Sequence, residues 1–335
     1  MNYFPVGKID YRLLEKLLSL NTIKDPRVIV GPQIGEDAAV IDFGEKYLIA
    51  KTDPVTFTAS HIGWYAVNVN ANDIAAMGAT PKWFLITILL PERKTNKKMV
   101  KQIFRDVLEA TRALNITLCG GHTEISCRLD RPIIIGHMLG EVEKDKLVIN
   151  SRACPGDDLL LTKGIAIEGT AIIAREKETE LKKRFGNRFV RKAQSFLRNP
   201  GLSVVKDALL ANKAAKIHAM HDPTEGGLAT GILELTKASG TGAVIDEEKI
   251  LCYPETEQIC KFFQIKPLGL IASGALLIAV DSGKTKEVVA ILARHGIVCT
   301  HIGKLTKKDA GLKLLQKGRL TKMPTFKVDE ITKVL

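Results

Sequence analysis

Apolar and polar positions follow two periods along this chain, one typical of helices and one typical of strands. In residues 9–20, the leucines at 13, 14, 17 and 18 share one face of a predicted helix, with charges opposite. We expect this helix to pack on the main body. Fully apolar runs such as KWFLITILLP and RPIIIGHMLGEV instead predict buried strands. Since helical and strand patterns alternate up to about residue 145, the first half of the chain is predicted to be an α/β domain.

A hairpin is predicted where AAVIDF and KYLIAKTD, both rich in strand-forming residues, flank a turn at Gly44-Glu45. RVIVGP, just before them, predicts one more strand. Asp37 precedes the first strand of the hairpin and Asp53 ends the second. Pairing of the two strands would bring these carboxylates toward the same edge.

Two helices are predicted on either side of the KWFLITILLP strand. IGWYAVNVNANDIAAMG predicts the first, with Ser60 as its N-cap and Gly78 at its end. NKKMVKQIFRDVLEATRALN has the strong amphipathic pattern of the second. TLCGGHTEI then predicts a strand, a glycine turn and a loop.

The first of these helices carries almost no charge. Asp73 is the one formally charged residue in the stretch 62–81, although the whole chain is 26% charged. A buried carboxylate needs a partner, because burying it unpaired costs several kcal/mol or shifts its pKa. Asn68 and Asn72 share a face of the helix. They either form an internal hydrogen-bond network or present oxygens to a ligand.

A change of composition at VINSRACPGDD marks a linker, so we place an N-terminal domain at residues 1–148 and a C-terminal domain at 149–335. Beyond the linker, the order is a strand, a helix, a turn that starts a helix, a glycine-interrupted strand, a helix and a strand. The segments are DLLLTKG, IEGTAIIAREKE, HAMHDPTEGGLATGILELTKASG, LGLIASGALLIAV, KEVVAILARHG and CTHIGKL. This second half is predicted to be a separate α/β domain.

Composition adds little that is specific, but it narrows the classes of function. A length of 335 residues favours two domains. No run of about 18 apolar residues appears, and the N-terminus lacks the apolar core of a signal peptide, so we expect a cytoplasmic protein without a membrane segment. The six cysteines form no CxxC and no metal-binding spacing, which favours reduced thiols.

The net charge of +12 is basic, with much of the excess in amphipathic stretches such as KETELKKRFGNRFVRK. A basic balance can indicate nucleic acid or another polyanion. Because aromatic residues make up 5% of the chain and no basic stripe is interleaved with them, nucleic-acid binding is poorly supported. A solvated basic surface explains the charge, and an anionic substrate or an acidic protein partner stays open.

Three aspartates, Asp37, Asp53 and Asp73, stand at joints of the predicted elements and suggest a metal site. Hard divalent cations prefer carboxylate oxygens, and Mg²⁺ commonly combines one or two protein carboxylates with phosphate oxygens of the substrate. The nearby loop GPQIGEDAA lacks the GK[ST] ending of a Walker A motif, but its glycine amides could form an anion-binding concavity. The alternative is that Asp37 and Asp53 serve as turn or cap residues.

Two further motifs combine glycines with chemically active side chains. GGHTEIS places His122, Thr123 and Glu124 just after two glycines. In HDPTEGGL, Asp222 and Thr224 could simply cap a helix, with Glu225 in its first turn. Its glycines would also bring bare backbone close to a ligand in front of that helix.

In their order, these motifs resemble the aminoimidazole-ribonucleotide synthetase superfamily. Its members include that purine enzyme, selenophosphate synthetase, thiamine-monophosphate kinase and the hydrogenase-maturation factor HypE. The resemblance runs from about residue 5 to 315 and is nearest to the HypE-like branch. The motifs are GEDAAVID, KTDP, IGWYAVNVNANDIAAMGA, GGHTEIS, RPIIIGHMLGEV, GDDLLLTKG, DPTEGGLATG and ASGALLIAV.

This resemblance implies a two-domain PurM-like fold of the α/β (α+β) class. The β-rich N-terminal half would form half of a barrel that a homodimer completes, and the C-terminal domain would be an α/β layer. ATP and Mg²⁺ would bind between the domains and activate an amide-type or similar acceptor, a small molecule or a protein-bound group, by phosphorylation. The implied nucleotide-binding residues are Gly35, Asp37, Asp53, Asn72, Asp73, Gly121, Thr123 and Asp222, with metal bound by Asp37, Asp53 and Asp73. The catalytic or acceptor-facing residues are His122, Glu124 and Glu225.

The chain also departs from the family's patterns. It ends in DEITKVL, without the C-terminal cysteine on which HypE performs its dehydration. Glu225 stands where HypE has an arginine, and His122 where thiamine-monophosphate kinases have an aspartate. Asp222 and Glu225 loosely match an acid pair of those kinases. We therefore keep three hypotheses: a HypE-like ATP-dependent enzyme, a small-molecule kinase, and a nucleotide-binding maturation partner without catalysis.

Overall fold

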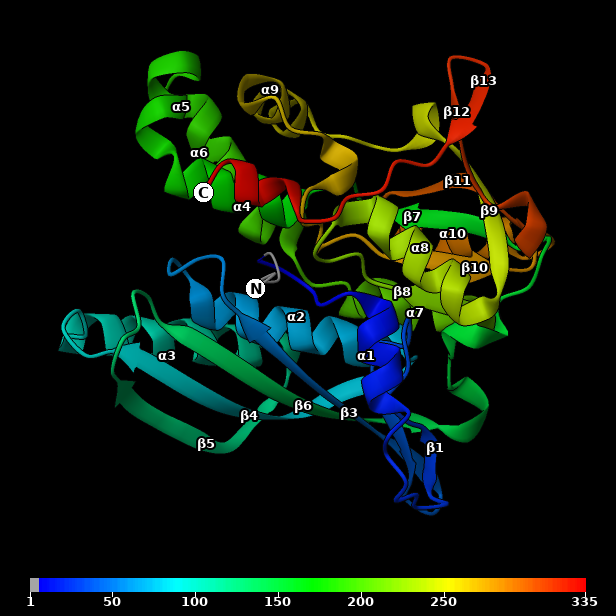
Figure 1. Ribbon diagram of the computed structural model, residues 1–335, viewed down its shortest axis with the longest axis horizontal. Coiled ribbons are helices and arrows are strands. Elements are labelled where there is room, and N and C mark those ends of the chain that lie inside the picture. Colours follow the sequence, from blue (N-terminus) through cyan, green and yellow to red (C-terminus); the bar gives the residue numbers. More distant parts are fainter. Residues whose placement is uncertain (1–5) are drawn as a thin grey trace.

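Two β-sheets, formed by successive stretches of the chain, organise the computed structural model, which describes residues 6–335 (Figure 1). The strands are β1 (Val28–Val30), β2 (Ala39–Asp42), β3 (Lys46–Val55), β4 (Thr80–Pro91), β5 (Thr117–Ser126), β6 (Ile133–Glu143), β7 (Asp158–Thr162), β8 (Ile217–His221), β9 (Thr241–Asp246), β10 (Leu277–Val280), β11 (Cys299–Lys307), β12 (Leu312–Gln316) and β13 (Arg319–Lys322). The α-helices are α1 (Tyr11–Leu18), α2 (Ile62–Ala76), α3 (Lys97–Leu114), α4 (Ile167–Glu176), α5 (Glu178–Phe185), α6 (Asn187–Ser195), α7 (Val205–Ala214), α8 (Gly227–Ser239), α9 (Pro254–Phe263) and α10 (Thr285–Arg294). The predicted α/β class is confirmed.

The first sheet has the strand order β1-β2-β3-β6-β4-β5, in which β4 and β5 are parallel and the other pairs antiparallel. The predicted hairpin is present as β2 and β3, with Ala39 opposite Ala50. The second sheet has the order β13-β12-β9-β11-β7-β10-β8. The predicted domain boundary between residues 148 and 149 falls in the connection between the two sheets and stays a prediction.

One face of the first sheet is covered by helices. Helices α2 and α3 pack against each other, and α2 packs on strands β3 and β6 (Figure 1). Side chains alternate between the two faces of a strand. Met138 of β6 is therefore buried under the helices, whereas its neighbours Leu139 and His137 lie on the opposite, open face.

Helix α2 is the most buried helix, since every one of its residues is buried. It ends as predicted, with Gly78 at a φ of 77° just beyond Met77. Its predicted N-cap was wrong. His61 caps the helix in a left-handed conformation with a φ of 54°, and the backbone N–H of Ser60 instead bonds to the Thr58 hydroxyl.

The predicted glycine turn in TLCGGHTEI was also wrong, because β5 continues through both glycines. At Gly121 the strand passes very close to β4. A Cβ on Gly121 would lie 1.9 Å from the carbonyl oxygen of Ile86. The glycine therefore permits close strand pairing where the sequence pattern suggested a reversal of the chain.

In the second half, the segment HAMH forms strand β8, which sequence analysis had assigned to a turn. The glycine-interrupted strand is shorter than predicted and comprises Leu277–Val280. The other predicted strands and helices of this half are confirmed as β7, α4, α8, α10 and β11. Strand β8 matters most for function, because it ends directly before Asp222.

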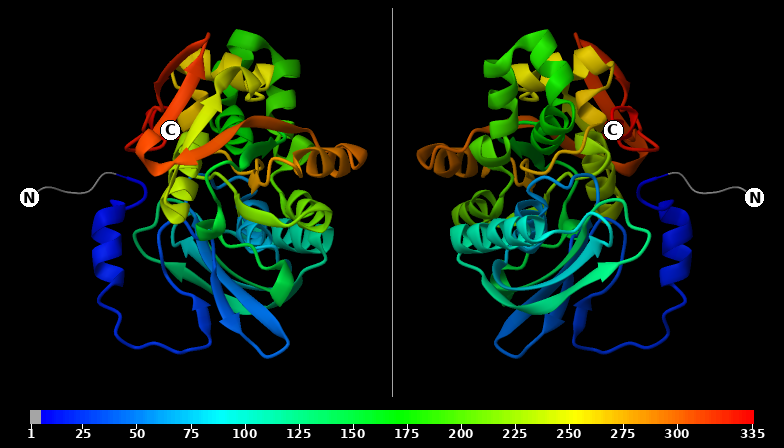
Figure 2. Two further views of the ribbon diagram at one scale, coloured as in Figure 1. Left: turned by 90° about the vertical axis from the view of Figure 1, so that its right-hand side faces the viewer. Right: turned by 90° about the vertical axis from the view of Figure 1, so that its left-hand side faces the viewer.

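Helix α1 forms where predicted but packs more loosely than expected. Leu14 and Leu17 are 37% and 52% exposed, and no residue of the helix is buried. Figure 2 shows α1 standing at one side of the molecule. Its Tyr11 ring contacts the ammonium group of Lys237. The expectation that this helix packs on the main body holds only in part, since Leu13 and Leu18 are half-buried.

The described residues contain neither a helix that could span a membrane nor a disulfide bond. Between residues 6 and 335, no helix combines the length and the apolar character needed to cross a membrane. All six cysteines lie in this part of the chain, and none forms a disulfide, in agreement with the expectation of reduced thiols.

Candidate functional site

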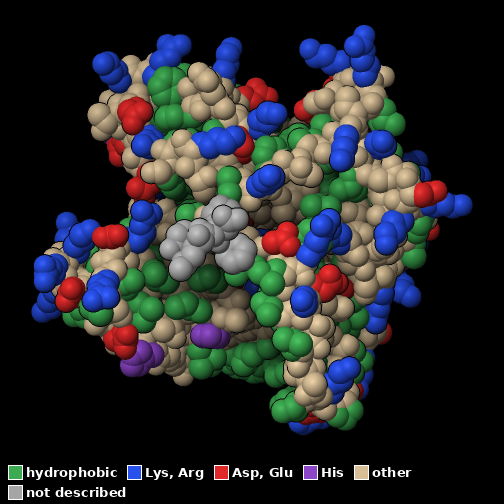
Figure 3. Space-filling view, viewed as in Figure 1, with side chains coloured by type: hydrophobic (Ala, Val, Ile, Leu, Met, Phe, Trp, Pro, Cys, Tyr) green, Lys and Arg blue, Asp and Glu red, His purple; other side chains and the backbone are tan. Residues whose placement is uncertain are grey.

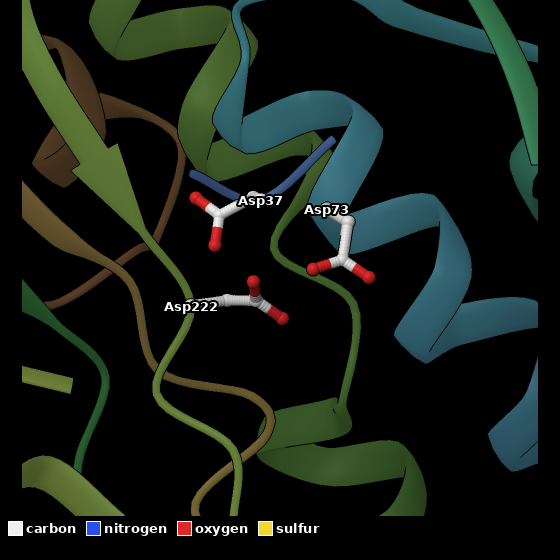
Figure 4. A group of neighbouring side chains, drawn as sticks. All are labelled: Asp37, Asp73 and Asp222. Atoms are coloured by element: carbon white, nitrogen blue, oxygen red, sulfur yellow. The ribbon is translucent and has the colours of Figure 1, made fainter. Parts of the chain in front are cut away.

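Three buried aspartates from distant parts of the chain meet between the two halves of the molecule (Figure 4). Asp37, Asp73 and Asp222 each offer a carboxylate oxygen, and these atoms all lie within 4.8 Å of one another. Asp37 belongs to the loop before β2, Asp73 to the last turns of α2, and Asp222 follows β8. We call these three residues the carboxylate cluster.

The oxygens of this cluster are short of hydrogen-bond donors. Within residues 6–335, Asp73 Oδ2 and both side-chain oxygens of Asp222 are buried without a hydrogen-bond partner. Leaving a buried acceptor unsatisfied costs about 1–3 kcal/mol, and more for a charged group. Three carboxylates, two of them with unpartnered oxygens, are the donor set that a hard divalent cation prefers. The residues present therefore fit a Mg²⁺ ion.

The electrostatics of the cluster point the same way. Burial raises the pKa of Asp73 to about 7, although the nearby Lys51 ammonium lowers it and Asp53 and Asp37 add repulsion. Burial also raises the pKa of Asp222 well above its ordinary value, and repulsion by Asp73 and Asp37 adds to this. A bound cation would relieve both the desolvation and the repulsion.

Lys51 is the lysine nearest to this cluster in the described part of the chain. Its Nζ lies 3.2 Å from Asp73 Oδ1 and 4.0 Å from Asp53 Oδ2. Burial works against the charge of Lys51, but Asp73, Asp53 and Asp37 outweigh it and raise its pKa. Side chains two apart on a strand share a face, so Lys51 and Asp53 both point toward α2.

The carboxylate cluster differs from the predicted metal set in one residue. The structure groups Asp222 with Asp37 and Asp73, whereas Asp53 lies beside the cluster and is linked to it through Lys51, so its predicted role as a metal ligand stays a prediction. The reason is topological, since strand β8 delivers Asp222 to this point and no sequence spacing reveals that. Asp53 instead lines the neighbouring cavity.

A chain of charged groups holds Asp37 in place. His221 Nδ1 donates to Asp37 Oδ1 at 2.6 Å, and His221 Nε2 donates to Glu234 Oε2 at 3.2 Å. Glu234 in turn receives the Lys8 ammonium at 2.9 Å. Burial alone would lower the pKa of His221, but the two carboxylates raise it well above 6.5. His221 is therefore a charged imidazolium that donates from both nitrogens.

Asn150 completes the support of Asp37. Its Nδ2 donates to Asp37 Oδ2 at 3.1 Å and to the carbonyl oxygen of Gly35 at 2.9 Å. His221, Glu234 and Asn150 were not among the residues predicted for the site. The adjacency of His221 to Asp222 in HAMHDP was the one available signal, whereas Asn150 lies in the presumed linker and gave none.

Several predicted site residues have a packing role in the structure. Asn72 donates to the carbonyl oxygen of Leu202 at 2.9 Å and accepts from the backbone N–H of Val204 at 2.8 Å. It thus joins the two halves, which favours the internal hydrogen-bond network over a phosphate contact. Gly35 faces α8 so closely that a Cβ would lie 2.4 Å from the carbonyl oxygen of Glu234. Its predicted nucleotide contact stays a prediction.

The helix-cap alternative for HDPTEGGL is wrong. Helix α8 has Gly226 as its N-cap, and no side chain forms a capping bond there. Asp222 is instead turned toward Asp37 and Asp73. Glu225 lies outside the carboxylate cluster, where its Oε1 accepts from the backbone N–H of Lys8 at 3.2 Å.

A cavity of about 350 Å³ lies next to the cluster, and both halves of the chain line it. Its polar lining residues are Lys8, Asp53, Thr56, Thr58, Glu168, Thr224, Glu225 and Ser273. Its apolar lining residues include Val55, Phe57, Val69, Ile172 and Ile271. Asp53 and Glu225 are thus predicted site residues that share one cavity.

His122 and Glu124 are not brought to this site within one chain. They lie on the exposed edge strand β5, where His122 Nε2 and Glu124 Oε2 are 3.1 Å apart. In register, His122 is opposite Thr87, Thr87 opposite Ile135, and Ile135 opposite Pro54. Residues paired in this way share a face, so both side chains lie on the open face, away from the face of Asp53.

Gly121 and Thr123 lie on the other face of β5, opposite Ile86 and Ile88 of β4. Strand β5 is separated from β3, which carries Asp53, by three strand spacings, or about 14 Å at the usual distance between strands. No described contact connects these residues with the carboxylate cluster. Their predicted contact with a nucleotide, and the predicted catalytic role of His122 and Glu124, stay predictions.

The predicted basic surface is prominent on the second half. Figure 3 shows lysine and arginine side chains gathered over its upper left and upper right, where Figure 1 places α5 and the β12–β13 hairpin. Helices α5 and α6 hold the stretch KETELKKRFGNRFVRK noted in the sequence. An acidic protein partner for this surface stays a prediction.

Comparison with known proteins agrees with this architecture. Residues 35–142 match the family described as AIR synthase related protein, N-terminal domain, and residues 154–313 match its C-terminal domain. A hydrogenase expression/formation protein of Methanocaldococcus jannaschii is 27% identical over 318 residues, which cover 91% of this chain and 90% of that protein. Selenide, water dikinase of Yersinia pestis is 27% identical over 349 residues, which cover 92% of this chain and 94% of that protein.

Among solved structures, the hydrogenase maturation protein HypE in complex with ATP has the same fold. The TM-score is 0.72 at 20% sequence identity, and the match covers 98% of each chain. At this identity the likeness concerns the fold alone. It confirms the predicted two-domain architecture.

Proposed function

Because the chain belongs to the AIR synthase related protein family, we propose that it is an enzyme that uses ATP and Mg²⁺ to phosphorylate, and so activate, an acceptor. The single observation that carries this proposal is the buried carboxylate cluster, with its unpartnered oxygens, at the junction of the two halves. Such a site gains most from a divalent cation that also binds phosphate oxygens.

The proposed roles follow from position. Asp37, Asp73 and Asp222 would hold Mg²⁺, which supplies neutralisation of phosphate charge when it is bound. His221 orients Asp37 through its 2.6 Å hydrogen bond. Lys51 would release Asp73 to the metal and keep its positive charge beside the phosphates, since its Nζ is already 3.2 Å from Asp73.

The identity of the phosphate acceptor is a separate question from the use of ATP. The relatives are described as a hydrogenase formation protein and a selenide, water dikinase, which points to ATP-dependent activation of a group rather than to a shared acceptor. Since no cysteine is among the described residues that line the cavity beside the cluster, we infer that the acceptor is a separate molecule or protein-bound group, as in the maturation of a hydrogenase or another protein.

The test is calorimetric titration of the full chain with a non-hydrolysable ATP analogue, with and without Mg²⁺. We expect binding that requires Mg²⁺, because the carboxylate cluster repels the phosphates until a cation is bound. Assay of ADP and phosphate release with ATP then separates the enzyme from a binding partner without catalysis. If the ATP analogue bound with the same affinity in the presence of EDTA as in the presence of Mg²⁺, the proposal would lose its basis.

The kinase of the thiamine-monophosphate type remains the second candidate, but one observation counts against it. Its support came from Asp222 and Glu225 as an acid pair, and Glu225 lies outside the carboxylate cluster. A kinase leaves a stable phosphorylated product, whereas the activation proposed here releases phosphate from a transient intermediate. Mass analysis of products therefore distinguishes the two.

We also propose that the chain forms a homodimer through the open face of the first sheet. In the described residues nothing covers this face, although it is apolar and half-exposed. An unpaired edge strand and an uncovered apolar sheet face both favour association. The open face is defined by Leu48, Leu85, Leu89, Ile133, Ile135 and Leu139.

Ile135→Lys should convert the dimer to a monomer, because it places a charge at the centre of the open face. Sedimentation velocity measures this against the monomer mass of 36.7 kDa. Val298→Lys, at an exposed apolar position of the second half, is the matched control and should leave the dimer intact. A monomeric wild-type chain at micromolar concentration would contradict the proposed dimer.

A further inference from the structure

Glu168 is a buried acid that the proposed phosphoryl chemistry does not use. It lies in the first turn of α4, is 4% exposed and lines the cavity beside the carboxylate cluster. Its Oε2 and the hydroxyl of Ser273 are both buried without a hydrogen bond of normal geometry within residues 6–335. Ser273 lies close enough to lower the pKa of Glu168, but burial outweighs this effect. A buried carboxylate in this state is costly to the folded protein.

The walls around Glu168 are apolar. Ile172 lies one turn further along α4, and Phe57, Val55 and Ile271 close the cavity from both halves of the chain. A volume of about 350 Å³ lies within the range of small-molecule sites. Such a space accepts the body of a small organic molecule or the end of a side chain.

The other charges in the cavity are also mostly negative. Asp53 and Glu225 line it together with Glu168. Lys8 is the one cation among the described lining residues, and its ammonium is engaged by Glu234 at 2.9 Å. The cavity thus combines apolar walls with an excess of carboxylates, a combination that favours a cation with an apolar body.

We propose that this cavity is the acceptor site, and that Glu168 pairs there with an ammonium, amidinium or guanidinium group of the acceptor. The proposal rests on the proposed function, since it places the acceptor beside the site proposed for Mg²⁺ and ATP. Asp53 lines the cavity and also contacts Lys51, which pairs with Asp73 of the cluster. An acceptor anchored at Glu168 therefore lies between the two halves, next to the proposed phosphate site.

Benzamidinium is a suitable probe, because it joins a flat cation to an apolar ring, and neutral benzamide has nearly the same shape. Equilibrium dialysis of the full chain at pH 8 should give saturable binding of benzamidinium and at least tenfold weaker binding of benzamide. Glu168→Gln should weaken benzamidinium binding at least tenfold. Glu178→Gln, at a half-exposed position of α5 outside the cavity, is the matched control and should bind like the wild type.

The outcomes separate this proposal from the proposed function. Each protein is also titrated with the ATP analogue and Mg²⁺, and benzamidinium binding is repeated with that nucleotide present. Simultaneous binding supports an acceptor site, whereas competition assigns the cavity to the nucleotide and overturns the proposal. Unchanged benzamidinium affinity in Glu168→Gln, or no saturable binding to the wild type, overturns it even if nucleotide binds. Glu168→Asp, which keeps the charge but shortens its reach, provides the test if Glu168→Gln does not fold.

Discussion

Asp222→Asn should lower Mg²⁺-dependent ATP turnover about 100-fold or more, while the nucleotide-free protein becomes more stable. The loss of turnover follows because Asp222 offers two unpartnered oxygens to the carboxylate cluster, and an amide gives the cation one neutral oxygen. Removing one group that stabilises charge in a transition state commonly costs this much.

The gain in stability has a separate cause. Asp222 is buried close to two other carboxylates, and burial together with their repulsion raises its pKa. An amide of the same shape removes that repulsion, which we expect to be worth about 1–2 kcal/mol. A variant that is more stable but inactive has lost a functional group, whereas a misfolded variant would lose both properties.

Two control variants sharpen this experiment. Asp106→Asn changes another buried aspartate, which is bonded to Gln102 and His61 at a distance from the cluster, and should leave turnover unchanged. Asp53→Asn tests the residue beside the cluster and should reduce turnover less than Asp222→Asn. Turnover is measured as ADP release, and stability by urea unfolding. Full activity of Asp222→Asn would refute the assignment of the cluster as the metal site.

Glu168→Gln should stabilise the protein at pH 8 and leave its stability nearly unchanged near pH 4.5. Burial raises the pKa of Glu168 from 4.5 to about 7, so the folded state holds its proton more tightly than the unfolded state. Stability therefore falls as the pH rises from 4.5 to 7, and the full cost is present above pH 7. This shift corresponds to about 3 kcal/mol, which the glutamine variant should recover.

The measurement is urea unfolding of both proteins at pH 4.5, 6, 7 and 8. The difference between them should grow across this range and level off above pH 7. Glu178→Gln serves as the reference, because its carboxylate is exposed and the pKa of Glu178 is lowered by Lys182. It should show no stabilisation at pH 8. A constant difference at all pH values would mean that Glu168 acts through packing rather than charge.

Much of the fold could be predicted from the sequence, because local patterns of apolar and polar residues determine many of its helices and strands. The hairpin of β2 and β3 follows from strand-forming residues around a turn, and α2 follows from an apolar run that ends at Gly78. The isolated charge of Asp73 in that run correctly marked a special position. Local patterns failed where a neighbouring strand decided the geometry, as at Gly121, whose missing side chain lets β5 pair closely with Ile86 of β4.

The candidate site could be predicted in part. Asp37 and Asp73 were predicted as candidate metal ligands, and the structure brings their carboxylates together. The choice between Asp53 and Asp222 as the third member could not be made, since it depends on where β8 ends in the second sheet. The roles of His221, Glu234 and Asn150 also depend on contacts between segments far apart in the sequence.

The sequence by itself determined the mixed α/β class, the resemblance to the family and the kinds of side chain available for chemistry. The class depends on periodicity and the resemblance on the order of the motifs, and both can be found along the chain without any contact between distant segments. Only the tertiary structure decided which carboxylates form one cluster, that Asn72 joins the two halves, and that His122 and Glu124 lie on the opposite face of the sheet. Those outcomes are set by strand register and by the packing of the two halves, because a one-residue change of register moves a side chain to the other face.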